Sequence, residues 1–247
     1  MPDDVRIAMW SGPRNISTAM MRSWENRKDC FVCDEPLYAH YLQQTGLDHP
    51  GATEVIECHE TDWRKVVDRL TGPIPENRTV FYQKHMAHHL LPHIGREWLD
   101  RLTHVFLIRE PAETISSYLV RRSTMSIEDT GLPQQWEIFE RIGEARGSAP
   151  PVIDSRDVLE HPRAVLDALC GRLGLDFSER MLHWPAGRRA TDGVWAKHWY
   201  NTVETSTGFQ PYKPKNASIP SEFSALVSEC EGYYRRLHTH RLVPANP

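Results

Sequence analysis

The sequence predicts an α/β fold: a three-layer sandwich in which helices cover both faces of a central parallel sheet. Short runs of apolar, β-branched and aromatic residues alternate along the chain with segments of helical spacing. The run HVFLI, residues 104–108, is apolar on both faces, which is typical of a central strand in a parallel sheet. Glycine, proline and charged residues follow several of these runs, where open α/β sheets bind their ligands.

The first half of the chain supplies three expected strands and two expected helices. Strands are expected at the apolar and β-branched runs 5–9, 30–35 and 79–83. A helix is expected over 17–26, where a serine and a threonine provide hydroxyls suited to a helix start. Another is expected over 62–70, because a Gly-Pro pair ends the pattern soon afterwards. Residues 37–61 are polar with weak periodicity, which predicts a surface excursion or a segment that shapes a substrate pocket.

The second half continues the same alternation. Apolar periodicity and helix-start residues predict helices over 98–102, 112–122, 132–146 and 221–237. The sequence PVID predicts a brief strand over 151–154. The segment 154–175 carries the clearest amphipathic helix. Its apolar positions are Val165, Leu166, Leu169 and Leu173, and Gly174 ends the pattern.

Length and composition favour one domain over residues 1–247. With 40% hydrophobic residues in 247, the chain can bury one large core. We expect that core over about 5–175, followed by an aromatic, loop-rich and helical part over about 176–247.

The charge balance argues against nucleic acid and membrane partners. There are 29 basic and 33 acidic residues, so the net charge is -4 and any anion site must be a local arrangement. No stretch of about 18 apolar residues occurs, and the N-terminus is acidic, so we expect a cytoplasmic protein.

The five cysteines are scattered and odd in number, which suits a reducing compartment. Cys30 and Cys33 have the CxxC spacing of redox and metal sites but fall in an expected strand, with no second pair to complete a zinc site. The simpler interpretation is two buried thiols.

The stretch WSGPRNISTAMMRSW, residues 10–24, predicts an anion site between a strand and a helix. Gly12 and Pro13 mark a tight loop, Arg14 adds a positive charge, and Ser17 and Thr18 add hydroxyls at a helix start whose N–H groups are free. Compared with the nucleotide-binding loop G-x-x-x-x-G-K-S/T, this loop lacks the second glycine, the lysine and the metal-holding hydroxyl. It therefore suggests a phosphate-like ligand other than a magnesium nucleotide.

Arg109 is a second candidate anion contact, because the 104–108 strand delivers it at its carboxyl end. Ser117 follows on the next expected helix. Two plainer interpretations stay open: Arg109 in an ion pair with Glu113, and Ser117 bonded to its own helix backbone.

Three separated stretches together resemble one family, the sulfotransferases that use 3'-phosphoadenylyl sulfate (PAPS). SGPRNIST is similar to that family's 5'-phosphosulfate loop, and LIREPAETISSYL is similar to its 3'-phosphate element, in which a serine follows an arginine by eight residues. VIDSRDVLEHPRAVLDALCGRLGL is similar to its strand, acidic turn, proline and helix ending in Leu-Gly-Leu. The resemblance covers about residues 5–175 and implies the P-loop NTPase-like sulfotransferase fold.

The resemblance also implies roles for the site residues. The loop residues Ser11, Gly12, Pro13, Arg14, Asn15, Ile16, Ser17 and Thr18 would hold the 5'-phosphosulfate, and Arg109 and Ser117 the 3'-phosphate. The product would be adenosine 3',5'-bisphosphate. Sulfuryl transfer spreads charge over oxygens that N–H groups and an arginine can stabilise, so no metal is expected.

A histidine near the sulfuryl group would serve as the general base for the acceptor. The family's Lys-Thr-His segment is similar to Lys84-His85-Met86, although alignment on Lys84 puts Met86 at the histidine position. His85 is the leading candidate and His88 the reserve. Lys84 could hold the bridging oxygen of the leaving group, so the expected catalytic set is His85, Lys84 and Arg14.

The same segment carries a competing metal interpretation. His85, His88, His89 and His93 are spaced as ligands on a helix would be, but Pro92 interrupts that helix and no carboxylate joins the set. Exposed histidines on a helix are the third interpretation.

The C-terminal part departs most from the family pattern. Instead of a basic glycine-rich loop it reads GRRATDGVWAKHWYNTVETSTGF. Three cations could bind the 3'-phosphate there: Arg188, Arg189 and Lys197. Three aromatic residues could stack a base or wall the acceptor pocket, or form a small core: Trp195, Trp199 and Tyr200.

The sequence thus predicts an enzyme that transfers a sulfuryl group from PAPS to a hydroxyl or amine of a small molecule, by in-line displacement with a histidine base. Two alternatives stay open: a small-molecule phosphotransferase on the same fold, and a non-catalytic nucleotide-binding protein. A homodimer is also left open.

Overall fold

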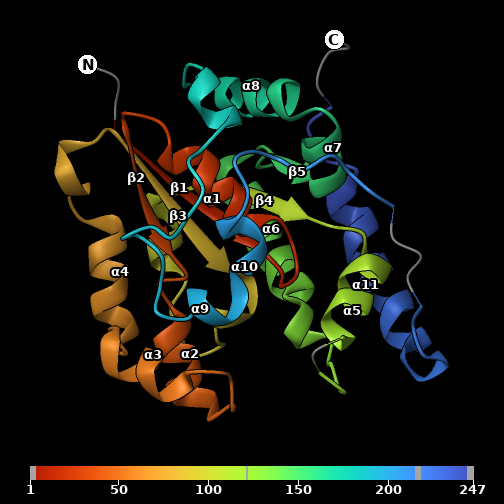
Figure 1. Ribbon diagram of the computed structural model, residues 1–247. Helices are drawn as coiled ribbons and strands as arrows, with labels where there is room; N and C mark the ends of the chain where they lie inside the picture. Colours follow the sequence, from red (N-terminus) through yellow and green to blue (C-terminus); the bar gives the residue numbers. More distant parts are fainter. Residues whose placement is uncertain (1–3, 121, 215–217, 244–247) are drawn as a thin grey trace.

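The computed structural model describes residues 4–120, 122–214 and 218–243, and its centre is a five-stranded parallel sheet (Figure 1). The strand order is β2-β3-β1-β4-β5, and every neighbouring pair is parallel. The expected α/β sandwich is therefore confirmed. The strands are β1 Val5–Ser11, β2 Cys30–Asp34, β3 Val80–Met86, β4 Thr103–Ile108 and β5 Val152–Asp154.

Two apolar cores lie on opposite faces of the sheet, because successive strand side chains point to opposite sides. Phe81 belongs to the core that covers one face and Tyr82 to the core on the other, where it stacks on Trp24. The first core is closed by helices α4 Trp63–Thr71, α6 Leu132–Arg146 and α11 Ser224–His238. The second is closed by α1 Ser17–Glu25 and α8 Pro162–Arg172.

The carboxyl ends of the strands carry a separate cap of helices. In Figure 1, α2 Tyr38–Thr45, α3 Ala52–Cys58, α9 Ala196–Trp199 and α10 Asn201–Glu204 gather at the end to which the β3 arrow points. A third small core joins this cap, with residues from both α2 and the C-terminal part. The excursion 37–61 therefore forms packed helices that lie over the sheet end.

Two helices begin directly after strands on the other half of the sheet. α5 Pro111–Leu119 has Glu110 as its N-cap, whose carboxylate accepts from the Glu113 N–H, and Pro111 in the first turn. α7 Ser155–Glu160 is capped in the same way by Asp154. These caps fix where each strand stops and each helix begins.

The segment after residue 154 differs from the expectation of a single amphipathic helix. It forms two helices, α7 and α8, with a break at His161, whose φ and ψ are -137° and 58°. Pro162 causes the break, because a proline inside a helix removes a hydrogen bond and clashes with the preceding turn.

The cysteines fit the interpretation as thiols packed in the fold. Cys30 is buried and Cys33 half-buried, on opposite faces of β2, and both are free. Burial raises the pKa of Cys30 and raises that of Cys33 to about 11, so neither is a reactive thiolate at neutral pH. No helix among the described residues combines the length and apolar character needed to cross a membrane.

Candidate functional site

The loop between β1 and α1 is shaped by close backbone approach. A Cβ atom on Gly12 would lie 2.2 Å from the carbonyl oxygen of Thr130, so only glycine fits there. Asn15 ties the loop to the sheet: its Nδ2 donates to the Leu107 carbonyl at 3.1 Å, and its Oδ1 accepts the Ile16 N–H at 2.8 Å. The loop is therefore held in one position at the carboxyl ends of β1 and β4.

Beside this loop, the first turn of α1 presents backbone N–H groups that no described side chain caps. Ile16 is the N-cap residue, and no side chain in the described part of the chain caps the helix there. Ser17 and Thr18 form the first turn and line a pocket. Free N–H groups, hydroxyls and the positive end of the helix dipole make this turn suited to an anion, and binding there stays a prediction.

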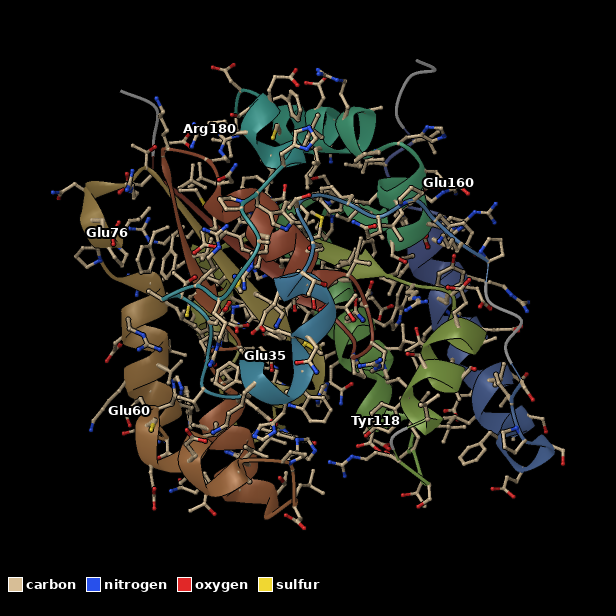
Figure 2. The ribbon with its side chains drawn as sticks, in the orientation of Figure 1. Glu35, Glu60, Glu76, Tyr118, Glu160 and Arg180 are labelled. Atoms are coloured by element: carbon tan, nitrogen blue, oxygen red, sulfur yellow. The ribbon has the colours of Figure 1, made fainter. Side chains whose placement is uncertain are left out.

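The pocket has a volume of about 270 Å³ and lies where the sheet end, the cap helices and the end of α5 meet. In Figure 2, Glu35 is labelled near the centre of the molecule and Tyr118 on α5. The lining residues come from the loop, α1, α2, β3 and α5, from the segments that follow β2, α2, β3 and α5, and from the C-terminal part: Pro13, Arg14, Asn15, Ser17, Thr18, Glu35, Tyr38, Tyr41, Leu47, His49, Lys84, Met86, His88, His89, Tyr118, Arg122, Thr124, Asp129, Trp199 and Tyr200.

Lys84 projects from β3 into a buried polar cluster at the floor of the pocket. Its ammonium donates to Asp34 at 2.8 Å, to Glu35 at 2.6 Å and to the Tyr200 hydroxyl at 2.7 Å. Burial alone would lower the pKa of Lys84, but the carboxylates of Asp34 and Glu35 outweigh it and raise that pKa well above its usual value. Lys84 is therefore a fixed positive charge at the pocket floor.

Glu35 is a pocket residue to which no role is assigned from the sequence. Its position at the end of an expected strand is the feature that could have indicated one. Its backbone is in the left-handed region at φ 39°, and its side chain is 13% exposed. Burial, aided by Asp34, raises the pKa of Glu35 although Lys84 opposes this. The result is a pocket carboxylate poised to take a proton nearer neutral pH than an ordinary glutamate.

His85 lies away from the pocket, because it alternates with Lys84 and Met86 along β3. It is buried, stacks on Trp10 with ring centroids 4.4 Å apart, and bonds Gln83 at 3.2 Å. Burial lowers the pKa of His85 to about 3. This placement disfavours the base role expected for His85 and leaves pocket residues as candidates, among them the reserve candidate His88.

The four histidines of the metal interpretation are dispersed. His88 and His89 line the pocket, His85 is in the core, and His93 bonds His40 through the two Nε2 atoms at 2.9 Å. Within residues 4–120, 122–214 and 218–243, no three His, Cys, Asp or Glu side chains are grouped to hold a metal ion.

Arg109 and Ser117 are joined to the loop through Arg14. The Arg109 guanidinium donates to the Arg14 carbonyl at 2.5 Å, and the Arg14 Nε donates to the Ser117 hydroxyl at 3.0 Å. Arg109 also pairs with Glu113 at 2.8 Å, the ion pair that the sequence left open, and Tyr212 donates to the same carboxylate at 2.5 Å. The structure therefore brings the two expected anion elements together.

The C-terminal cations lie elsewhere. Lys197 is exposed and pairs with Glu54 on α3, Arg188 lies 3.6 Å from Glu204, and Arg189 lies 3.8 Å from Glu25. None of the three lines the pocket. The aromatic residues fit both interpretations: Trp195 and Tyr200 belong to the third core, against which Trp199 packs, and Trp199 and Tyr200 also line the pocket.

A parallel α/β sandwich with a tight loop and a helix N-terminus after its first strand is typical of a class of proteins that bind phosphate-like groups at the sheet end. Within that class, the sequence profile of the family described as "Sulfotransferase domain" matches residues 5–235. The chain belongs to this sulfotransferase family.

Two curated relatives come from Arabidopsis thaliana and are named branched-chain-amino-acid aminotransferase-like proteins 2 and 1. Each is 34% identical to this chain over 235 residues, which is 95% of this chain and 41% and 42% of the relatives. The chain thus spans about two-fifths of their length.

Solved structures share the fold. The sulfotransferase domain of the Synechococcus PCC 7002 olefin synthase matches with a TM-score of 0.59 and 18% identity, covering 94% of this chain and 95% of that one. A sulfotransferase from Alicyclobacillus acidocaldarius matches with a TM-score of 0.54 and 14% identity, covering 97% of each. At these identities the likeness concerns the fold alone.

Proposed function

We propose that this chain transfers a sulfuryl group from PAPS to a hydroxyl or amine of a small molecule. The observation that carries the proposal is the meeting of the α1 N-terminus, Arg14 and the buried cation Lys84 around one pocket. Membership of the sulfotransferase family supports it. The aminotransferase-like name of the Arabidopsis proteins is not carried over, because this chain corresponds to only part of them.

The donor would lie along the loop and α5. Ser17 and Thr18, with the free N–H groups of α1, would hold the 5'-phosphosulfate, and Arg14 would add its charge. Arg109 and Ser117 would hold the 3'-phosphate. Arg109 would then exchange the carboxylate of Glu113 for the phosphate, an exchange that keeps the guanidinium paired in both states.

Lys84 would stabilise the charge that develops on the oxygen between sulfur and phosphorus as that bond breaks. It is suited to this because two carboxylates and a tyrosine hydroxyl hold its ammonium in place before the substrate arrives. Its position on the pocket floor, beside the residues that line the α1 end, supports this role.

We assign the general base to Glu35. Its carboxylate faces the pocket, its raised pKa makes it a stronger base than an ordinary glutamate, and its bond to Lys84 would place it beside the reacting group. His88 is the second candidate because it also lines the pocket. However, burial lowers the pKa of His88 to about 4, which makes it the weaker base.

Calorimetric titration tests the donor assignment before any acceptor is known. We expect adenosine 3',5'-bisphosphate to bind far more tightly than 5'-AMP, because only the bisphosphate offers a 3'-phosphate to Arg109. Arg109→Ala should erase this difference, while Arg141→Ala, which removes an exposed cation on α6, should preserve it. Equal affinities in the unmodified protein would contradict the assignment.

The same titration and a turnover assay together separate the alternatives. A phosphotransferase would bind ATP more tightly than the bisphosphate. A non-catalytic nucleotide-binding protein would bind the bisphosphate but release none from PAPS with any acceptor, which a coupled assay of bisphosphate release would show.

A further inference from the structure

Arg122 marks the outer half of the pocket. It follows the C-terminal end of α5 and lines both the pocket and the open hollow at its mouth, where Asp48, Thr124 and Trp199 also lie. Its backbone N–H continues the helix by bonding Tyr118, which fixes the base of the side chain. Arg122 therefore lies at the C-terminal end of α5, whereas Arg109 lies at its N-terminal end.

The charge of Arg122 is not used inside the protein. The two other cations of the pocket are engaged, Lys84 by carboxylates and Arg14 by Ser117. Across the described ranges, by contrast, no side chain or carbonyl forms a hydrogen bond or ion pair with the guanidinium of Arg122, which is half-buried. A partly buried arginine without a protein partner is a ready site for an anionic group of a ligand.

The neighbouring titratable groups do not form an ion pair with this guanidinium. Asp129 lines the same pocket, but its carboxylate accepts the Ser126 N–H at 2.8 Å and makes no ion pair with Arg122. Burial, and next the charge of Arg122, lower the pKa of His49 to about 4, so that imidazole is neutral beside it. The tyrosines around Arg122 are neutral as well, since burial raises the pKa values of Tyr38 and Tyr118.

Aromatic rings line the same pocket as Arg122. Tyr38 is stacked on His89, with ring centroids 4.8 Å apart and planes 6° from parallel. The ring centroid of Tyr41 lies 4.6 Å from that of His89. Trp199 and Tyr118 line the pocket too. Rings held in this way favour a flat, apolar ligand body.

We propose that the acceptor is a carboxylate-bearing alcohol or phenol, bound with its carboxylate on Arg122 and its apolar body between the aromatic rings. Its hydroxyl would then reach Glu35 and Lys84 at the other end of the pocket. A single planar guanidinium near one aspartate matches one carboxylate charge better than a phosphate dianion. This inference rests on the proposed function, because it concerns the acceptor side of the same site.

Three matched phenols test the inference: 4-hydroxyphenylacetate, 2-(4-hydroxyphenyl)ethanol and tyramine, which share one ring and differ in charge. They are titrated calorimetrically into the full chain saturated with adenosine 3',5'-bisphosphate. We expect millimolar or tighter binding of the carboxylate, about ten-fold better than that of the neutral alcohol, with tyramine weakest.

The variants assign the preference to one residue. Arg122→Gln should abolish the ten-fold difference, and Arg122→Lys should retain part of it. Arg141→Gln should leave the difference as it is in the starting protein. The affinity for the bisphosphate should be the same in all four proteins, because Arg122 is not a donor residue.

Failure of this inference and failure of the proposed function are distinguishable. If the bisphosphate does not bind, the sulfotransferase proposal fails. Titration of the three phenols without bisphosphate then still shows whether Arg122 favours the carboxylate. If the bisphosphate binds but the phenols bind equally, tyramine binds best through Asp129, or none binds at millimolar concentration, the carboxylate inference is overturned.

Discussion

Glu35 shows how one side chain acquires chemistry from its neighbours. An ordinary exposed glutamate is fully ionised at neutral pH and is a weak base. Here burial raises its pKa, while the bond to Lys84 keeps the carboxylate at the floor of the pocket. The strained backbone at φ 39° is consistent with a residue retained for a role in a site.

We expect Glu35→Gln to lower kcat by about 10²-fold or more, the usual scale for loss of a general base, with the bisphosphate affinity unchanged. Because the base must be ionised, activity should fall as pH decreases through the raised pKa of Glu35. That acid limb should lie at higher pH than an unperturbed glutamate would give, and a pH–rate profile checks it.

Two histidine variants serve as controls for that assignment. His88→Ala should leave the acid limb in place, and His85→Phe should keep kcat because its ring lies in the core against Trp10. A loss of turnover confined to His88→Ala would give the base role to His88, and one confined to His85→Phe would return it to His85.

At the scale of an element, the loop from β1 to α1 depends on its contact with the turn at Thr130. Gly12→Ala would place a methyl group 2.2 Å from the Thr130 carbonyl oxygen, so one of the two backbones must move. We expect weaker bisphosphate binding, by about ten-fold or more, and a loss of stability of about 1–3 kcal/mol.

Gly171→Ala is the matched control, because a Cβ on that glycine meets nothing within 4 Å. It should preserve affinity and slightly stabilise α8, since alanine favours a helix over glycine by about 1 kcal/mol. Thermal denaturation and calorimetry on both variants check the pair. Unchanged binding in Gly12→Ala would show that the loop position does not control the anion site.

The elements themselves could be predicted because local patterns encode them. All five strands and the long helices follow from apolar periodicity and from prolines and glycines at their ends. The break at Pro162 is marked in the sequence by the proline itself, whereas the amphipathic pattern on both sides favours one continuous helix. The loop at Gly12 was recognisable because its residues are contiguous.

The floor of the site could not be predicted in the same way. Alternation along β3 decides that Lys84 and Met86, and not His85, face the pocket, and the face follows only once the sheet is assembled. Tyr200 reaches Lys84 across more than a hundred residues, which no local pattern records. The ion pairs of Arg188 and Lys197 likewise depend on how the C-terminal part folds over the cap.

At the scale of the whole molecule, buried neutral histidines make stability sensitive to acid. Burial lowers the pKa values of His85 to about 3 and of His88 and His104 to about 4, and that of His89 well below its usual value. In the unfolded chain these groups take up protons below about pH 6.5, so the unfolded state binds more protons than the folded state there.

The free energy of unfolding should therefore be flat above about pH 6.5 and fall below it, by at most ~1.4 kcal/mol per pH unit for each histidine. Urea unfolding at neutral and at mildly acidic pH checks this. His85→Phe should remove about one proton from the slope. Glu35 and Asp154, whose pKa values are raised, act in the opposite direction. If the free energy of unfolding did not change across this pH range, the histidines would not be the dominant groups.

The hydroxyl of Tyr200 touches both Lys84 and Asp34, and this contact has a consequence for how the site is assembled in time. The sheet is complete at β5, yet the cation at the pocket floor gains its last partner only when residues 195–200 dock. A ribosome-bound chain that has emerged only as far as α8 would therefore possess the whole sheet and the loop from β1 to α1, while water still reached the lysine to which we assign stabilisation of the leaving oxygen.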